Sequence, residues 1–144
     1  MSQIRIPKSA EPLLPLCRKS GDALDNACFD TYADLLAFAA SCGYHSLGGR
    51  KPTPPDAFLS IPNAVDLAIF DNQKLLPALL LIGLATTGDY QITRDDESLC
   101  QLIEGCVDRG CKVLLKEVSV SATAHLNFAQ LLDTTHHADK DDKI

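Results

Sequence analysis

Residues 28–44 read CFDTYADLLAFAASCGY, and we expect the rest of the chain to pack around this stretch. Thr31, with Asp34 three residues later, is typical of a helix N-cap followed by an acidic first turn. Every side chain of residues 35–40 is apolar, so this helix has almost no face to present to water. Gly43 is predicted to end it, because glycine enters the left-handed region without a steric penalty. A short helix that is apolar on nearly all sides must be enclosed by protein, and it is therefore the predicted core element.

Apolar periodicity predicts further helices before and after this core helix. They are expected over residues 9–19, 61–70, 73–87, 95–110, 111–118 and 122–132. Ser9 and Asn72 are candidate N-caps, and Pro15 should kink or shorten the first of these helices. Gly110 is expected to separate the two helices on either side of it. The helix over residues 73–87 is apolar on most faces and is predicted to be buried against the core helix.

The N-terminal residues show a different period. Ile4 and Ile6 alternate with Gln3 and Arg5, which is the pattern of a short half-buried strand. The predicted fold class is therefore mainly α: a compact single-domain helical bundle with one short N-terminal strand.

Length and composition are those of one globular unit. With 144 residues, of which 46% are hydrophobic, the chain is long enough to bury a core without disulfides or metals. Residues 1–133 are predicted to form a single domain, and residues 134–144 a disordered polar tail. The longest apolar run covers residues 75–85, well short of the roughly 20 residues that a membrane-spanning helix needs. No charged segment followed by an apolar one opens the chain, so we expect a cytoplasmic protein without membrane contact, whose six cysteines are free thiols.

The net charge of −6 is unevenly distributed along the chain. Residues 1–60 carry six basic and six acidic side chains, whereas residues 61–144 carry seven basic and thirteen acidic ones. The first twenty residues hold four basic side chains against Glu11 alone. If any surface meets a polyanion, we expect it to be at this N-terminal end, because the C-terminal half should repel it.

The sequence lacks motifs for catalysis or for a bound cofactor. It contains no G-x-S-x-G nucleophile elbow and no glycine-rich phosphate loop. Cys42 and His45 are the only closely spaced pair with metal-binding chemistry, and buried packing cysteines are the favoured interpretation. A minor nuclease or sulfur-handling enzyme that used this pair would need an unusually reactive Cys42 thiol. We expect no enzymatic activity, no metal and no cofactor.

The segment SLGGRK at residues 46–51 is superficially similar to an anion-binding loop. Prolines follow it instead of the helix start that supplies most such sites, so a flexible exit loop is the favoured interpretation. Tyr44, Arg50 and Lys51 are the candidate interaction residues at this loop, with an ordinary solvated loop as the alternative.

A strand, a helix and a second capped helix in this order also suggest a DNA-binding dimer of the ribbon–helix–helix kind. In that unit two chains pair their strands and insert the outward side chains into the major groove. Gln3 and Arg5 would face the bases, since glutamine and arginine suit adenine and guanine edges, and Lys8 would lie near a phosphate. The long connection between the helices, Pro15 and the acidic composition argue against this alternative.

Several pieces of the chain together resemble one protein family. They are FDTYADLLAFAASCG at residues 29–43, RKP at 50–52, the segment 61–70, LIE at 102–104, and RGCKVL at 109–114 with Glu117. On these pieces, which follow in the same order over residues 4–132, the chain resembles the family called DNA phosphorothioation-associated protein 4, or Dnd system-associated protein 4.

The resemblance implies a bacterial cytosolic accessory of DNA phosphorothioation, a modification in which sulfur replaces a phosphate oxygen and which serves phage defence. It implies no catalytic residues. The function predicted first is therefore a non-enzymatic accessory or adaptor that works through contacts with the other proteins of the defence system. A homodimer and direct contact with DNA are left open.

Overall fold

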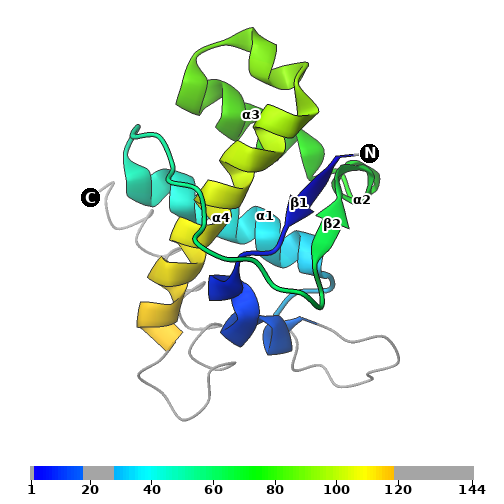
Figure 1. Cartoon of the computed structure of the whole chain (residues 1–144), viewed down its shortest axis with the longest axis vertical. Helices are drawn as coiled ribbons and strands as arrows, with labels where there is room; N and C mark the ends of the chain where they lie inside the picture. Colours follow the sequence, from blue (N-terminus) through cyan, green and yellow to red (C-terminus); the bar gives the residue numbers. More distant parts are fainter. Residues whose placement is uncertain (1, 18–27, 119–144) are drawn as a thin grey trace, which may run out of the picture.

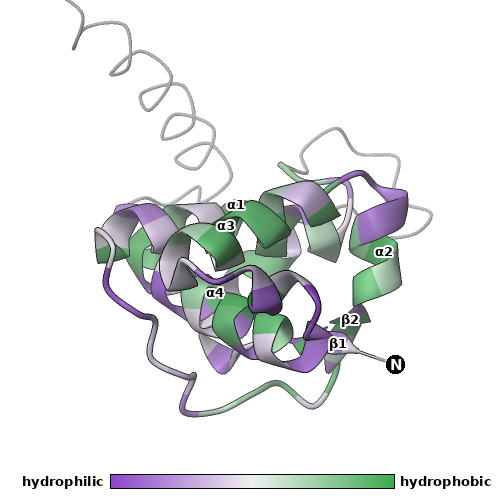
Figure 2. Cartoon of the chain, turned by 90° about the horizontal axis from the view of Figure 1, so that it is seen from above, coloured by the Kyte–Doolittle hydropathy of each residue, from purple (hydrophilic) through white to green (hydrophobic). Residues whose placement is uncertain are grey.

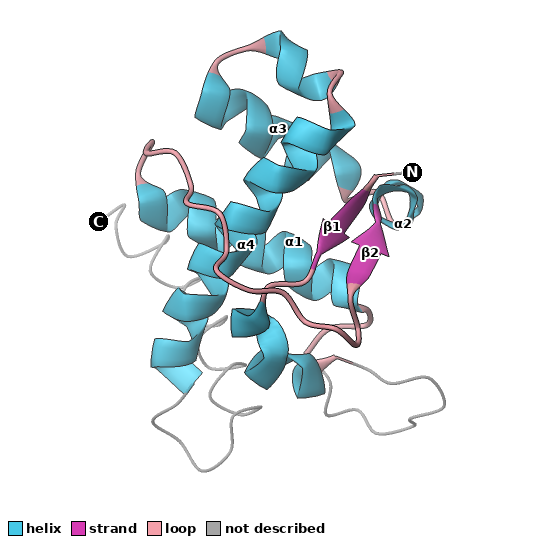
Figure 3. Cartoon of the chain, viewed as in Figure 1, coloured by secondary structure: helices cyan, strands magenta, loops and turns pink. Residues whose placement is uncertain are grey.

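Two helices that cross each other, α1 and α4, form the centre of the molecule (Figure 1). The computed structural model describes residues 2–17 and 28–118. In chain order, the described elements are β1 (Gln3–Arg5), the 3-10 helix η1 (Lys8–Leu16), α1 (Tyr32–Leu47), β2 (Ala64–Asp66), α2 (Leu67–Asn72), α3 (Leu76–Thr87), the 3-10 helix η2 (Tyr90–Thr93) and α4 (Asp96–Val118). The predicted fold class is confirmed, because the protein is mainly α-helical and has a short N-terminal strand (Figure 3).

Helix α1 begins where the sequence predicts and ends later. The backbone N–H of Asp34 donates to the hydroxyl oxygen of Thr31 at 3.2 Å, so Thr31 is the N-cap. The helix continues through Gly43 and ends at Gly48, whose φ of 58° is the left-handed conformation that glycine adopts readily. The prediction that Gly43 ends the helix is therefore wrong.

Gly43 and Gly110 instead lie where α1 and α4 touch. A Cβ atom added to Gly43 would lie 1.8 Å from the carbonyl oxygen of Cys106, and one added to Gly110 would lie 1.8 Å from the carbonyl oxygen of Ala39. Only a residue without a side chain fits at such a contact. The prediction that Gly110 separates two helices is also wrong, since α4 is continuous through it.

Helix α4, rather than α3, is the main packing partner of α1. Helix α4 makes far more contacts with α1 than α3 does. Its buried apolar side chains include Leu99, which lies against Gly83 of α3, as well as Ile103, Val107 and Leu114. Helix α3 is hydrophobic around much of its circumference (Figure 2), yet only one side of it is buried. Leu81, on its outer side, is 65% exposed. The prediction that α3 is enclosed against the core helix is therefore only partly right.

Strands β1 and β2 form a two-stranded antiparallel sheet in which Ile4 lies opposite Val65. Ile4 and Ile6 are fully buried, as their alternation predicts. The helix predicted over residues 61–70 is wrong in its first half, because residues 64–66 are paired with β1 and the helix begins only at Leu67. Pairing with a strand 60 residues away is invisible to local periodicity.

Prolines shape the segment that follows β1. The helix predicted from Ser9 is a 3-10 helix that starts at Lys8 and contains Pro12 and Pro15, which cannot donate the hydrogen bonds of an α-helix. Ser9 is not its N-cap. Asn72 likewise ends α2 instead of capping α3.

Several predictions concern residues outside the described part of the chain. These are the end of the first helix at residues 18–19, the helix over 122–132, the domain boundary at 133 and the tail over 134–144. Among the described helices, none combines the length and the apolar character needed to cross a membrane.

Candidate functional site

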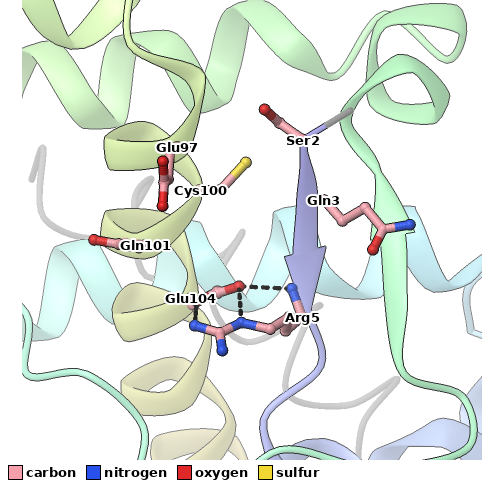
Figure 4. A pocket seen from close by; sticks show the side chains of 7 residues that line it. All are labelled: Ser2, Gln3, Arg5, Glu97, Cys100, Gln101 and Glu104. Carbon is pink, nitrogen blue, oxygen red and sulfur yellow. Dashed lines mark hydrogen bonds and ion pairs between the residues drawn. The ribbon is translucent and has the colours of Figure 1, made fainter.

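A polar groove of about 490 Å³ lies between β1 and the N-terminal half of α4 (Figure 4). Four residues of α4 line one side at helical spacing, so they share one face of that helix. The strand side comes from β1 and the residue before it. The lining residues are Ser2, Gln3, Arg5, Glu97, Cys100, Gln101 and Glu104.

The ion pair of Arg5 with Glu104 forms one end of this groove. The guanidinium Nη2 of Arg5 lies 2.9 Å from Glu104 Oε1, and its Nε donates to Oε2 at 3.1 Å. The backbone N–H of Arg5 also donates to Oε2, at 2.7 Å. The Glu104 side chain is 3% exposed and that of Arg5 48%, so the buried carboxylate is held by three donors. The hydrogen bond to Glu104 raises the pKa of Arg5 above its usual value.

Aromatic packing holds the same arginine from a second side. The central carbon of the Arg5 guanidinium lies 4.0 Å from the ring centroid of Phe58, which is cation–π geometry. Arg5 therefore works as a clamp between the N-terminal strand, α4 and the loop that precedes β2.

A second contact repeats the clamp one helical turn further along α4. The Ser9 hydroxyl donates to Asp108 Oδ1 at 2.6 Å, and Lys112 Nζ lies 3.0 Å from Asp108 Oδ2. Residues 5 and 9 are four apart, as are Glu104 and Asp108, so the N-terminal segment runs along α4 in a fixed register.

The sequence analysis did not identify Glu104 or Asp108 as site residues. The pattern that could have identified them is a pair of acidic side chains at positions i and i+4 on the apolar side of a helix.

The groove offers hydrogen bonding more than covalent chemistry. Gln3 Nε2 donates to Asp66 Oδ1 at 2.6 Å across the sheet, while Gln101 and Glu97 are exposed on α4. Burial, followed by the charge of Glu104, raises the pKa of the Cys100 thiol to about 11. Cys100 is therefore protonated near neutral pH and is a poor nucleophile.

The structure separates the two sets of predicted site residues. Gln3 and Arg5 line the groove, and Lys8 is exposed at the start of η1. Arg50 and Lys51 are exposed just after α1, outside the lining of the groove.

Tyr44 was expected in the exposed loop, and that expectation is wrong. It lies within α1, is half-buried and packs against the core. The helix reaches Leu47 because Gly43 does not end it, and this places Tyr44 one turn inside the helix instead of after it.

The N-terminal geometry differs from that of a ribbon–helix–helix dimer. Strand β1 pairs with β2 of the same chain, and the outward N–H of Arg5 is taken by Glu104. The Arg5 guanidinium is likewise engaged within the protein. In a ribbon–helix–helix dimer the strand pairs with a second chain and its outward side chains contact the bases. The N–H and the guanidinium of Arg5 could do so only if their bonds to Glu104 were broken.

The cysteines have the character of packing residues. All six are free thiols, and Cys17, Cys100, Cys106 and Cys111 are buried. Burial raises the pKa of Cys42, which disfavours a reactive thiolate there. Within the part of the chain that the structure describes, no three histidine, cysteine or acidic side chains gather as a metal site would need.

The fold and the groove together define a class: a small, mainly α-helical protein with a hydrogen-bonding groove beside a two-stranded sheet. More particularly, the chain belongs to the family described as DNA sulphur modification system-associated protein 4, whose model matches residues 3–143. This confirms the family predicted from the sequence, and the description associates the family with a DNA sulphur modification system. Searches of curated proteins and of solved structures returned no match.

Proposed function

We propose that this protein is a non-enzymatic accessory of a bacterial DNA sulphur modification system and that it acts as an adaptor for other proteins of that system. The observation that carries the proposal is family membership over nearly the whole chain, at residues 3–143. The same proposal places the protein in the cytoplasm and its role in defence against phage.

The chemistry of the groove agrees with an adaptor. The buried carboxylate of Glu104 is already bound by Arg5, and the Cys100 thiol is protonated near neutral pH. What remains accessible is chiefly the pair of polar side chains Gln101 and Glu97 on α4, beside the exposed Gln3, whose amide already donates to Asp66. Such groups form the hydrogen-bonding rim of a protein interface. We therefore place the partner contact at this groove, with Arg50 and Lys51 as a separate candidate surface.

Co-purification with the other proteins of the same modification system tests the adaptor role. The tagged full-length chain is co-expressed with them, and the complex is measured by size-exclusion chromatography with light scattering. Gln101→Arg introduces a bulky charge into the groove and should abolish the complex. Gln91→Arg makes the same change at an exposed glutamine of η2 outside the groove, and it should leave the complex intact. Equal behaviour of the two variants, or no complex with any of these proteins, would contradict the proposal.

Cysteine variants test whether the protein is non-enzymatic. Cys42→Ser and Cys100→Ser are expected to support normal DNA sulphur modification in cells, as long as the variants fold. Loss of modification in a variant that still folds and still forms the complex would indicate a catalytic thiol instead.

The alternative from the sequence, a ribbon–helix–helix-like DNA-binding dimer that uses Gln3, Arg5 and Lys8, has less support. Two of these three residues form contacts within the chain, and β1 already has a partner strand. The light-scattering measurement on the isolated protein also determines whether a homodimer exists.

A further inference from the structure

We propose that the C-terminal end of α1, together with the adjoining face of α4, binds the phosphodiester backbone of nucleic acid through Arg50, Lys51 and Arg109. This inference goes beyond the adaptor role and does not depend on it. It also places nucleic-acid contact away from the N-terminal strand. We call these three residues the basic edge.

The two arginines of the basic edge are fixed to neighbouring residues in the last turn of α1. Arg109 Nε donates to Ser46 Oγ at 3.0 Å, and Arg50 Nε donates to the carbonyl oxygen of Leu47 at 2.8 Å. Each guanidinium is thus anchored through Nε, and no described side chain accepts a hydrogen bond from its two Nη groups. An arginine held in this way presents a fork that matches two oxygens of one phosphate.

The path of the chain brings Arg109 to this place. Helices α1 and α4 touch at Gly43 and Gly110, so the residue before Gly110 lies beside the end of α1. The loop after α1 then passes over α4, where Pro52 lies against Gly105 (Figure 1). Residues separated by almost 60 positions therefore form one exposed surface.

The charge of the basic edge is not cancelled by described acidic side chains. Arg50, Lys51 and Arg109 are all exposed, and none forms an ion pair within residues 2–17 and 28–118. The nearest acidic residues along α4, Glu104 and Asp108, are buried and already paired. The C-terminal dipole of α1 contributes only about half a negative charge against three positive ones. A local excess of positive charge therefore remains on a protein whose net charge is −6.

An extended polyanion fits this surface better than an enclosed small anion. The three cations are solvent-exposed on a turn and a helix face, where a backbone can pass across them. No helix begins directly after the SLGGRK segment at residues 46–51, so helix amides cannot bind an anion there. The positive charge of this surface comes instead from three cationic side chains, one of which belongs to α4. Contacts of this kind position a nucleic acid without reading its sequence.

Salt-dependent binding of the full-length protein to duplex DNA tests the basic edge. Fluorescence polarisation is measured with a labelled 20-base-pair duplex from 50 to 200 mM salt. Three phosphate contacts give a slope of log K against log salt of about −2.7, or about a 40-fold loss of affinity over this range. In Arg50→Gln/Arg109→Gln the slope should fall to about −0.9, a loss of about 3.5-fold. Circular dichroism verifies that the variants fold.

Arg94→Gln is the matched control. Arg94 is an exposed arginine just before α4, about 20 Å along the helix axis from Arg109, and it should not affect binding. Unlabelled single-stranded RNA and poly-glutamate, added as competitors, separate a phosphate backbone from an acidic peptide. Competition by RNA but not by poly-glutamate supports the proposal. Absence of binding, an unchanged slope in the double variant, an equal loss in Arg94→Gln, or stronger competition by poly-glutamate overturns it.

Discussion

At the scale of single residues, Arg5 joins three parts of the chain, because it holds the buried carboxylate of Glu104 and the ring of Phe58 at once. It was a candidate for reading DNA bases because it is an exposed arginine on the outer side of a strand. In the structure the Arg5 side chain instead attaches β1 to α4. A loss of any activity in an Arg5 variant therefore has to be separated from a loss of fold.

Substitution of Arg5 measures the strength of this attachment. In Arg5→Ala the Glu104 carboxylate keeps the backbone N–H of residue 5 but loses both guanidinium bonds. We expect the free energy of unfolding to fall by about 2 kcal/mol, since an under-paired buried charge is costly while the half-exposed arginine limits the effect. Urea denaturation measures the change. Lys8→Ala removes an exposed cation nearby and should stay within about 0.5 kcal/mol of the parent protein. Equal midpoints for the two variants would refute the clamp.

Because Cys111 is buried, we expect the stability of the folded protein to fall as the pH becomes alkaline. Burial, then the charges of Asp108 and Cys42, raises the pKa of Cys111 from 9.0 to about 12. The folded protein therefore holds this proton more tightly than the unfolded chain. The stabilising contribution is complete below about pH 9 and is lost as the pH rises toward 12.

Denaturation at a series of pH values from 8 to 11 tests this dependence. The parent protein should lose more stability over this range than Cys111→Ala, which lacks the titrating group. The two proteins differ only at residue 111, so the difference between their curves isolates this thiol. Parallel curves would show that folding does not raise the pKa of Cys111.

At the scale of elements, the crossing of α1 and α4 depends on two glycines. Gly43→Ala places a methyl group against the carbonyl oxygen of Cys106, and a backbone atom cannot move aside as a side chain can. We expect a loss of about 3 kcal/mol from overpacking, the opposite of the usual gain when alanine replaces glycine inside a helix.

Gly83→Ala in α3 is the comparison for this prediction. Its added methyl would meet the side chain of Leu99, which can rotate, so its effect should remain within about 1 kcal/mol. Thermal denaturation of both variants compares them directly. The close crossing would be contradicted if Gly43→Ala were as stable as Gly83→Ala.

For the molecule as a whole, the N-terminal segment closes the core. It contributes the buried side chains of Ile4, Ile6, Ala10 and Leu13, and it ties itself to α4 through Arg5 and Ser9.

Deletion of residues 1–16 should abolish cooperative thermal unfolding, because it exposes the core and leaves both Glu104 and Asp108 without their partners from this segment. Circular dichroism melts measure the result. Deletion of residues 134–144, the tail that the sequence predicts to be disordered, is the control and should leave the melting temperature unchanged. A sharp transition in the N-terminal deletion would show that the segment is dispensable.

How much of the candidate site the sequence could predict depends on the range of the interactions. Gln3 and Arg5 were identified from the alternation of β1, and they do line the groove. Glu104 and Arg109 were not identified, because their importance comes from Arg5 and Ser46, which lie 99 and 63 residues away in the chain. No local pattern reports on such partners.

The sequence by itself determined what depends on neighbouring residues: the N-cap at Thr31, the buried alternation of Ile4 and Ile6, the mainly helical class and the family. These follow from capping, side-chain period and residue order, which are properties of short stretches. Only the tertiary structure decided that Gly43 and Gly110 are contact points instead of helix ends. A glycine that ends a helix and a glycine that admits another backbone look alike along the chain, and they differ only in what lies against the missing side chain.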